Sequence, residues 1–181
     1  MSTGRELDDE RLTETLARHR VDYLLVGGMG AGAYGALRET SDFDCLAERS
    51  IENLDRLAAA MKELGARLRV EGLSDKESAT LTVPLDGAWL RNQEITTWRT
   101  DAGDFDVLCN MPARDGTRKR YEDFIDRAEH VEMYTSVVTV AALDDIIASK
   151  QWANRPKDID ALPELLALAD RLDTEPDGLD L

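Results

Sequence analysis

The stretch VDYLLVGG (residues 21–28), with SDFDC (residues 41–45) soon after it, decides the fold. The first stretch is an apolar run that ends at a glycine pair, and this pattern predicts a buried strand that turns directly into a helix. In the second stretch two aspartates alternate with apolar residues, which predicts a strand with one polar side and one side in a core. Together they predict a strand, a helix and a second strand built around a polar site.

The second stretch carries the first candidate site residues. On a strand Asp42 and Asp44 point to the same side, while Phe43 points to the other. Two like charges so close together are unfavourable unless a cation lies between them, and carboxylate oxygens suit Mg²⁺. The alternative interpretation is a pair of solvated acids at the edge of a strand.

The stretch DFDVL (residues 104–108) repeats this pattern on a later strand. If the two strands are neighbours, Asp106 faces the same side as the first pair and completes a two-metal site for in-line displacement at a phosphoryl group. The same carboxylate could take the proton from the attacking hydroxyl. We expect Asp104 to be its solvated neighbour.

The glycine pair Gly27–Gly28 lies where the first strand gives way to the helix. Backbone N–H groups at such a helix start can hold a phosphate. A tight turn without any ligand is the alternative interpretation.

Apolar spacing and turn residues predict the remaining elements. We expect helices at 7–19, 29–37, 51–64, 121–128, 141–152 and 159–172, and strands at 66–70, 79–85, 95–99 and within 131–140. This order predicts one α/β (α+β) domain with a mixed sheet flanked by helices. Its core spans about 7–140, a C-terminal helical part spans about 141–172, and 173–181 forms an acidic tail.

Charge and composition exclude several classes of protein. The chain has 22 Lys and Arg against 37 Asp and Glu, a net charge of −15, so we expect no duplex-DNA binding. The basic stretch RDGTRKR (residues 114–120) is either a solvated loop or a phosphate-facing one. No long apolar run and no apolar leader are visible, so we expect a cytoplasmic protein without a membrane partner. We expect the three tryptophans to pack in the core or against helices rather than to stack on a base; they are Trp89, Trp98 and Trp152.

Taken together, the glycine pair, DFD (residues 42–44) and FDV (residues 105–107) resemble the DNA polymerase β-type nucleotidyltransferase superfamily. The segments YGALRETSDFD (residues 34–44), ALDDIIASK (residues 142–150) and RPKD (residues 155–158) are similar to its AbiEii/MenT-like toxin branch. The resemblance implies a nucleotidyltransferase core followed by C-terminal helices. It implies an NTP cosubstrate and Mg²⁺, or Mn²⁺, as cofactor.

The resemblance also assigns roles by position. It implies that the metal ligands are Asp42, Asp44 and Asp106, that further catalytic residues are Lys150 and Asp158, and that the nucleotide-binding residues are Gly27, Gly28, Arg38, Thr40, Ser41 and Lys150. Lys150 would contact the triphosphate, and Asp158 would position Lys150 or Arg38. The sequence departs from the superfamily at Met29, where many members have serine. Because it is shorter than many toxin relatives, we expect it to lack an extra recognition domain.

Three functions follow from these residues. The resemblance implies transfer of NMP from an NTP to the 3′ end of tRNA, by a toxin with a cognate antitoxin protein. The same chemistry on a protein side chain or on a small aminoglycoside-like alcohol is the alternative, which the acidic surface favours somewhat. A degenerate domain that only binds a partner is the third, and the intact carboxylates argue against it.

Overall fold

The computed structural model describes residues 6–174. Its centre is a mixed seven-stranded sheet in the order β3-β4-β5-β2-β1-β9-β8, and a two-stranded ribbon, β6-β7, stands apart. The strands are β1 (Tyr23–Val26), β2 (Asp42–Ala47), β3 (Arg67–Arg69), β4 (Ile95–Thr100), β5 (Gly103–Leu108), β6 (Met111–Pro112), β7 (Arg118–Lys119), β8 (Glu129–Met133) and β9 (Ser136–Val140). The pairs β2/β5 and β1/β9 are parallel, and the other pairs are antiparallel.

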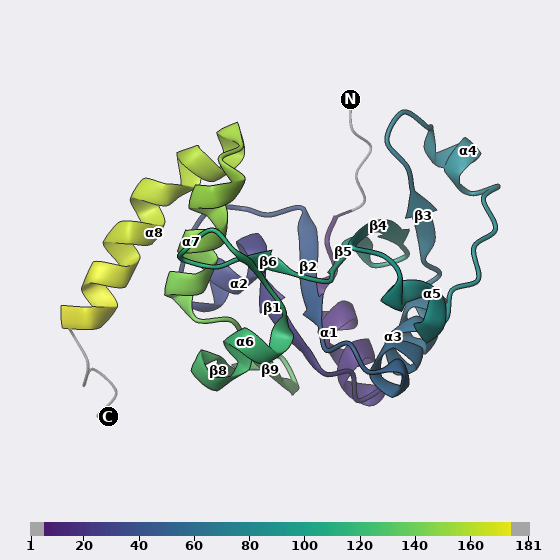
Figure 1. Cartoon of the computed structure of the whole chain (residues 1–181), viewed down its shortest axis with the longest axis horizontal. Helices are drawn as coiled ribbons and strands as arrows, with labels where there is room; N and C mark the ends of the chain where they lie inside the picture. The colour runs from purple at the N-terminus through teal and green to yellow at the C-terminus, as the bar shows by residue number, and fades with distance from the viewer. Residues whose placement is uncertain (1–5, 175–181) are drawn as a thin grey trace.

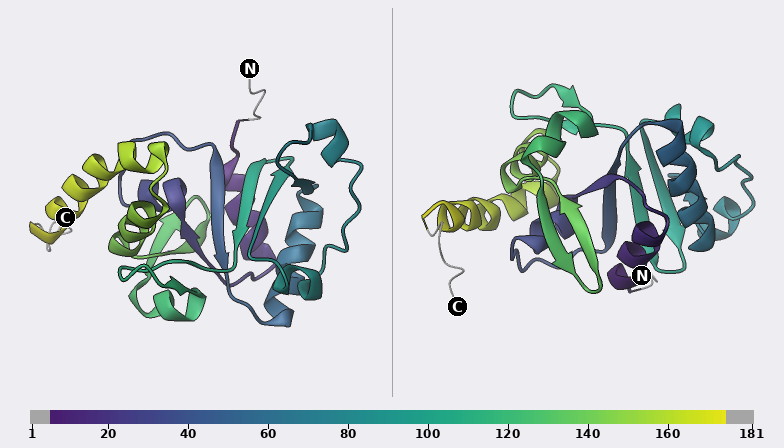
Figure 2. Two further views of the ribbon diagram at one scale, coloured as in Figure 1. Left: turned by 45° about the horizontal axis from the view of Figure 1, so that its top comes forward. Right: turned by 90° about the horizontal axis from the view of Figure 1, so that it is seen from below.

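Two groups of helices lie at opposite ends of this sheet, as Figure 1 shows. They are α1 (Asp9–Arg18), α2 (Gly27–Ala33), α3 (Ile51–Glu63), α4 (Asp75–Ser78), α5 (Gly87–Arg91), α6 (Tyr121–Phe124), the 3₁₀ turn η1 (Ile125–Arg127), α7 (Leu143–Ala153) and α8 (Pro156–Thr174). Helices α3 and α5 lie at one end and α7 and α8 at the other, while α1 and α2 lie beside the central strands. Both views of Figure 2 show α8 extending outward. None of the helices in residues 6–174 is long and apolar enough to cross a membrane.

The core packs against the apolar side of the central strands. Phe43 on β2 and Phe105 on β5 are fully buried and their rings stack with centroids 5.4 Å apart. Trp98 on β4 lies in register with Phe105 and is also buried. Helix α3 begins after Ser50, whose side chain accepts a hydrogen bond from the backbone N–H of Asn53. This apolar layer leaves the opposite side of β2 and β5 to polar side chains.

The predicted α/β fold with a mixed sheet is confirmed, and one predicted strand is wrong. Residues 79–85 form an irregular connection between two short helices, because Pro84 cannot donate a ladder hydrogen bond. The capping box of Ser74 and Glu77 begins α4, and the Asp86 side chain accepts from the backbone of Trp89 to begin α5. Both are capping patterns readable in the sequence.

Several element boundaries also differ from the predictions. The helix expected at 29–37 begins at Gly27 and ends at Ala33, and α8 begins at Pro156 instead of 159. The helix expected at 121–128 is α6 with a 3₁₀ turn. Of the predicted tail 173–181, residues 173 and 174 continue α8, and 175–181 lie outside the described residues.

Candidate active site

The site begins with the register between β2 and β5. In this parallel pair Asp42 lies opposite Asp104, and Asp44 lies opposite Asp106. Residues two apart on a strand share a side, so all four carboxylates belong to the polar side of the sheet. The structure therefore brings together the three carboxylates that the sequence analysis singled out.

The fourth carboxylate, Asp104, differs from the prediction that it is a solvated neighbour. Its Oδ2 lies 2.6 Å from Nη1 of Arg69 on β3, and its Oδ1 lies 3.0 Å from Nε of Arg99 on β4. Both arginines come from strands on the far side of β5, which local sequence does not reveal. Asp104 is thus neutralised by protein cations.

The neighbouring pair, Asp44 and Asp106, forms no ion pair with a cation among the described residues. Burial first, and then the charges of Asp106 and Asp42, raise the pKa of Asp44 to about 7. Burial is also the largest cause that raises the pKa of Asp106. Among the described residues, Oδ1 of Asp106 is a buried oxygen without a hydrogen-bond partner. These two carboxylates are therefore poised to gain from a nearby cation.

A divalent cation fits this donor set. Within residues 6–174 no group of three or more His, Cys, Asp or Glu side chains is already arranged as a metal cluster. Asp42 instead receives a hydrogen bond from Oγ of Ser41 at 3.0 Å, and its Oδ2 lies 3.8 Å from Nζ of Lys157. The unpartnered oxygen of Asp106 and the raised pKa of Asp44 are features of carboxylates that a bound divalent cation would stabilise.

The glycine pair has a role that neither sequence interpretation contained. Gly27 has φ +63°, and a Cβ there would lie 1.9 Å from Oδ2 of Asp44. A Cβ on Gly28 would lie 2.7 Å from Oγ1 of Thr40. The register that places Val26 opposite Asp44 explains this close approach. The pair lets Asp44 and Thr40 lie against the start of α2.

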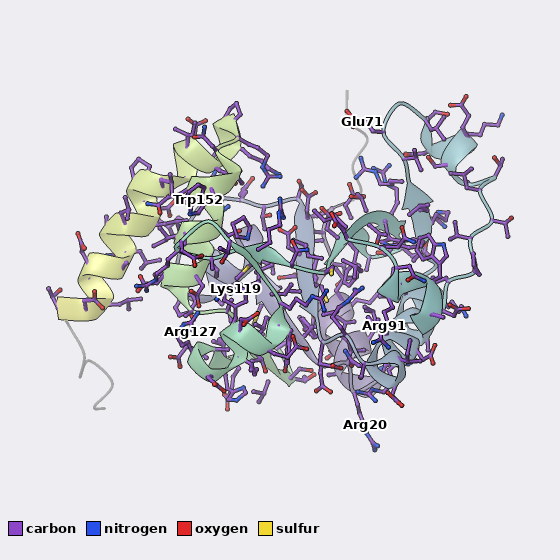
Figure 3. The ribbon with its side chains drawn as sticks, viewed as in Figure 1. Arg20, Glu71, Arg91, Lys119, Arg127 and Trp152 are labelled. Atoms are coloured by element: carbon purple, nitrogen blue, oxygen red, sulfur yellow. The ribbon has the colours of Figure 1, made fainter. Side chains whose placement is uncertain are left out.

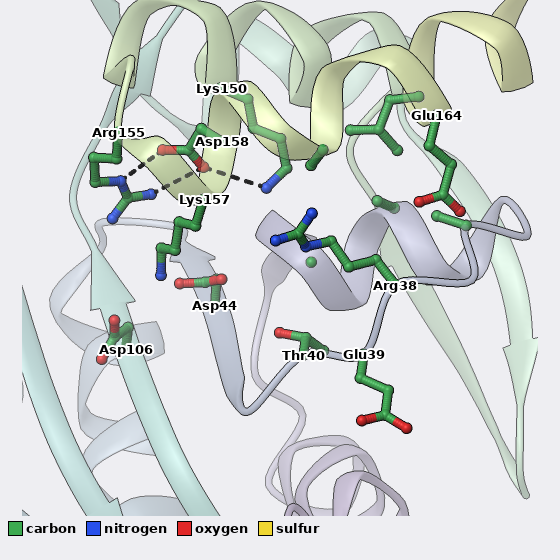
Figure 4. Close-up of a pocket in the computed structure, with 15 residues that line it drawn as sticks. Arg38, Glu39, Thr40, Asp44, Asp106, Lys150, Arg155, Lys157, Asp158 and Glu164 are labelled. Atoms are coloured by element: carbon green, nitrogen blue, oxygen red, sulfur yellow. Dashed lines mark hydrogen bonds and ion pairs between the residues drawn. The ribbon is translucent and has the colours of Figure 1, made fainter.

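The opposite wall of the site is basic and is organised by one buried acid. The Asp158 side chain on α8 is fully buried, and it accepts hydrogen bonds from Nε of Arg155 at 2.6 Å and from Nζ of Lys150 on α7 at 3.5 Å (Figure 4). Burial acts to raise the pKa of Asp158, but the hydrogen bond and charge of Arg155, with the charge of Lys150, outweigh it and lower that pKa. Asn154 takes a left-handed conformation that ends α7 just before Pro156 begins α8.

An acidic wall, formed by Asp44 and Asp106 on β2 and β5, faces this basic wall of Lys150, Arg155 and Asp158 across one open pocket. Figure 4 shows the acidic strands facing the basic helices across it. Of the predicted residues, the lining includes Gly28, Arg38, Thr40, Asp44, Asp106, Lys150 and Asp158. The other three predicted residues adjoin the pocket: Gly27 lies against Asp44, Asp42 forms the ion pair with Lys157, and Ser41 donates a hydrogen bond to Asp42.

Sequence reasoning assigned no role to four lining residues, Glu39, Arg155, Lys157 and Glu164. Arg155 and Lys157 both precede Asp158 in the stretch RPKD, and this clustering of two cations beside a predicted site residue was the available signal. Oε1 of Glu164 accepts a hydrogen bond from the backbone N–H of Leu37 at 2.5 Å, which ties the loop before β2 to α8. Asp158 contacts Lys150 rather than Arg38, and the described residues give Arg38 no hydrogen bond or ion pair.

The basic stretch 114–120 lies outside this pocket. Arg114 pairs with Asp144, and Arg118 donates to Oδ1 of Asn110 at 3.0 Å. Trp152, which is 55% exposed, covers Gly116 and donates from Nε1 to the carbonyl oxygen of Arg114 at 3.3 Å. Figure 3 shows Trp152 at the end of the molecule that holds α7 and α8. Its observed contacts are those of a packing residue.

Comparison with solved structures identifies the fold. The chain is similar to the nucleotidyltransferase ANT(2″)-Ia in complex with adenylyl-2″-tobramycin, at 15% identity over 92% of this chain and 91% of that chain, with a TM-score of 0.56. It is also similar to the solution structure of the antibiotic-resistance factor ANT(2″)-Ia, at 12% identity over 92% and 90%, with a TM-score of 0.53. No protein-family model and no curated protein matches the chain. The chain therefore has a nucleotidyltransferase fold, as the sequence motifs implied.

Proposed function

We propose that this protein is a metal-dependent nucleotidyltransferase that moves NMP from an NTP to an acceptor hydroxyl. The observation that carries the proposal is the pairing of Asp44 with Asp106 across β2 and β5, facing Lys150 and Arg155 across one pocket. The carboxylates can bind a divalent metal ion, and the fixed cations opposite them can bind phosphate oxygens. This arrangement therefore suits a metal-bound triphosphate. The proposal needs both walls, because the carboxylates alone would not bind phosphate and the cations alone would not bind metal.

The residues of each wall then have distinct tasks. Asp42, Asp44 and Asp106 would hold Mg²⁺ or Mn²⁺, which when bound supplies positive charge to the phosphates and the attacking oxygen. Lys150 and Arg155, held by Asp158, bind and orient the triphosphate. Asp106 lies on the acidic wall with an unpartnered oxygen, so it accepts the proton of the attacking hydroxyl. The acceptor oxygen bonds to the α-phosphorus, and pyrophosphate leaves.

For the acceptor we propose the 3′ end of tRNA, with the protein acting as a toxin that a cognate antitoxin restrains. The support is the resemblance of 34–44, 142–150 and 155–158 to the AbiEii/MenT-like branch. The net charge of −15 would slow encounter with RNA, and the basic stretch 114–120 offsets it locally.

A small cationic alcohol is the second candidate acceptor. The observation that favours it is the similarity to ANT(2″)-Ia over nearly the whole of both chains, since that structure holds a nucleotide-derivatised tobramycin. An acidic surface also attracts a cationic substrate.

Label transfer distinguishes these acceptors. Purified protein, Mg²⁺ and each α-labelled NTP would be incubated in turn with total tRNA, with tobramycin and with cell protein, and Asp42→Asn/Asp44→Asn would serve as the control. We expect label on tRNA that the double variant does not give. Label on tobramycin or on protein alone would replace the tRNA proposal, and label on none of the three would contradict transfer to these acceptors.

A further inference from the structure

The four cations that line the pocket are not held alike. Lys150 and Arg155 both bind the buried carboxylate of Asp158. Arg38 has neither a hydrogen bond nor an ion pair within residues 6–174. Lys157 alone points across the pocket to the acidic wall, where its Nζ lies 3.8 Å from Oδ2 of Asp42. In Figure 4 its amine lies on the side of Asp44, away from the Asp158 cluster.

The position of Lys157 places one positive charge near all three candidate metal ligands. Besides its ion pair with Asp42, its charge lowers the pKa of Asp44 and of Asp106. The fourth carboxylate of the sheet has two arginines of its own and needs no such partner. Lys150 also lowers the pKa of Asp44, and Arg69 lowers that of Asp106, but among the described residues only Lys157 forms an ion pair with one of the three candidate ligands.

The contact is also one that can be given up. The Lys157 side chain is 60% exposed, and 3.8 Å is a loose ion pair rather than a hydrogen bond. Its backbone is fixed in the first turn of α8, directly after Pro156, while the four-carbon stem is flexible. The amine can thus swing away from Asp42 without any change in the fold.

We propose that Lys157 is a resident counter-ion of the carboxylate site, which leaves when a divalent cation binds and then contacts the phosphates of the bound nucleotide. The inference rests on the proposed function. An ammonium and a divalent cation at the same carboxylates repel each other, so the amine and the metal compete. Once the metal is bound, triphosphate oxygens become the nearest negative charges for the displaced amine.

Two titrations with opposite expected signs test this inference. Mn²⁺ binding would be measured by electron paramagnetic resonance without nucleotide, for the wild type, Lys157→Met and the matched control Lys62→Met, which removes an exposed lysine on α3. We expect Lys157→Met to bind Mn²⁺ about tenfold more tightly than the wild type, in the usual range of coupling between two ligands. Lys62→Met should stay within about twofold, since Lys62 does not line the pocket and salt screens the charge of an exposed residue outside it.

The second titration uses a non-hydrolysable NTP analogue with saturating Mn²⁺. Here we expect Lys157→Met to bind the analogue about tenfold more weakly, because a charge-assisted phosphate contact is lost. Unchanged Mn²⁺ affinity in Lys157→Met, or a change of the same sign in both titrations, would overturn the inference and leave the proposed function standing. Absence of Mn²⁺ binding in the wild type, with and without analogue, would overturn both. Thermal unfolding confirms that each variant is folded.

Discussion

The two walls of the pocket hold their charges by opposite means. On the acidic wall the sheet register and the buried Phe43–Phe105 layer force Asp44 beside Asp106, and burial raises the pKa of both carboxyls. On the basic wall a single buried carboxylate, Asp158, gathers Lys150 and Arg155 and its own pKa is lowered. The carboxylates of the acidic wall repel each other when both are ionised, whereas the charges of the basic wall are already paired with each other.

This contrast indicates which wall gains more stability from a bound ligand. Carboxylates that repel each other gain free energy when a cation arrives, so ligand binding should stabilise the acidic wall most. The basic wall should gain little stability from a ligand, because its cations are already paired with a buried acid. These fixed cations offer a preorganised binding surface to phosphate. The predictions below disturb one wall at a time.

The largest expected effect is on the acidic wall. Asp44→Asn should reduce nucleotidyl transfer by about 10³-fold, the size of losing one group that stabilises charge in the transition state. The same change should not lower stability in the presence of a chelator, since it removes a buried, repelled charge. Steady-state kinetics measure the loss of activity, and urea unfolding with EDTA measures the change in stability. Equal activity in Asp44→Asn and the wild type would contradict the assignment.

The pH dependence of stability follows from the same carboxyl. Its pKa of about 7 in the folded protein exceeds the ordinary value near 4, so the folded state binds more protons between these values. With EDTA present, this group should lower the free energy of unfolding as pH rises from about 4 to 7, by up to about 4 kcal/mol. The difference between wild type and Asp44→Asn in urea unfolding, measured from pH 5 to 8, isolates it. A difference that does not vary with pH would contradict the raised pKa.

Gly27 lies directly against the Asp44 side chain of the acidic wall, and changing it should have an intermediate effect on stability and activity. Gly27→Ala adds a Cβ that would lie 1.9 Å from Oδ2 of Asp44, at a backbone φ of +63°. We expect a loss of about 2–3 kcal/mol of stability together with reduced transfer, because Asp44 must move. Gly32→Ala is the control, since a Cβ there meets nothing within 4 Å, and it should be neutral or slightly stabilising. Thermal unfolding of both variants measures the contrast, and equal stability would contradict it.

The basic wall should respond more mildly. Asp158→Asn keeps the shape of the side chain and removes the charge that holds Lys150 and Arg155. We expect KM for the NTP to rise about tenfold, with a smaller change in kcat, because ground-state binding of the triphosphate is affected most. Steady-state kinetics at varied NTP measure both constants. A loss of kcat without a rise in KM would instead place Asp158 in the chemical step.

The smallest effect is expected outside both walls. Trp152→Ala removes an indole that covers Gly116 and does not line the pocket. Stability should fall by about 1 kcal/mol or less, and KM for the NTP should stay within about twofold. A larger rise in KM would assign Trp152 a role in stacking on the base.

Local pattern predicted the acidic wall well because alternation along a strand is a local property. The stretches 41–45 and 104–108 each showed which side chains face together. The pairing of Asp104 with Arg69 and Arg99 depends on β3 and β4, so no local pattern could show it. The same holds for the contact between Gly27 and Asp44, which follows from the register of β1 on β2.

The wrong strand at 79–85 has a local cause. Its alternation of threonine with apolar residues suggested a strand, but Pro84 and the helix caps at Ser74 and Asp86 favour short helices around a loop. On the basic wall, Lys150 and Asp158 were expected from the resemblance alone. Their contact requires the sharp turn at Asn154, which a sequence pattern does not measure.

The measurement that tests the two-wall account most directly is calorimetric titration of a non-hydrolysable NTP analogue into the wild type, Asp44→Asn and Asp158→Asn, each with Mg²⁺ and with EDTA. If the walls form one site, the wild type binds tightly only with Mg²⁺, Asp44→Asn loses most of this Mg²⁺ dependence, and Asp158→Asn keeps it at about tenfold lower affinity. Equal binding with Mg²⁺ and EDTA, or binding that neither substitution changes, would contradict the account.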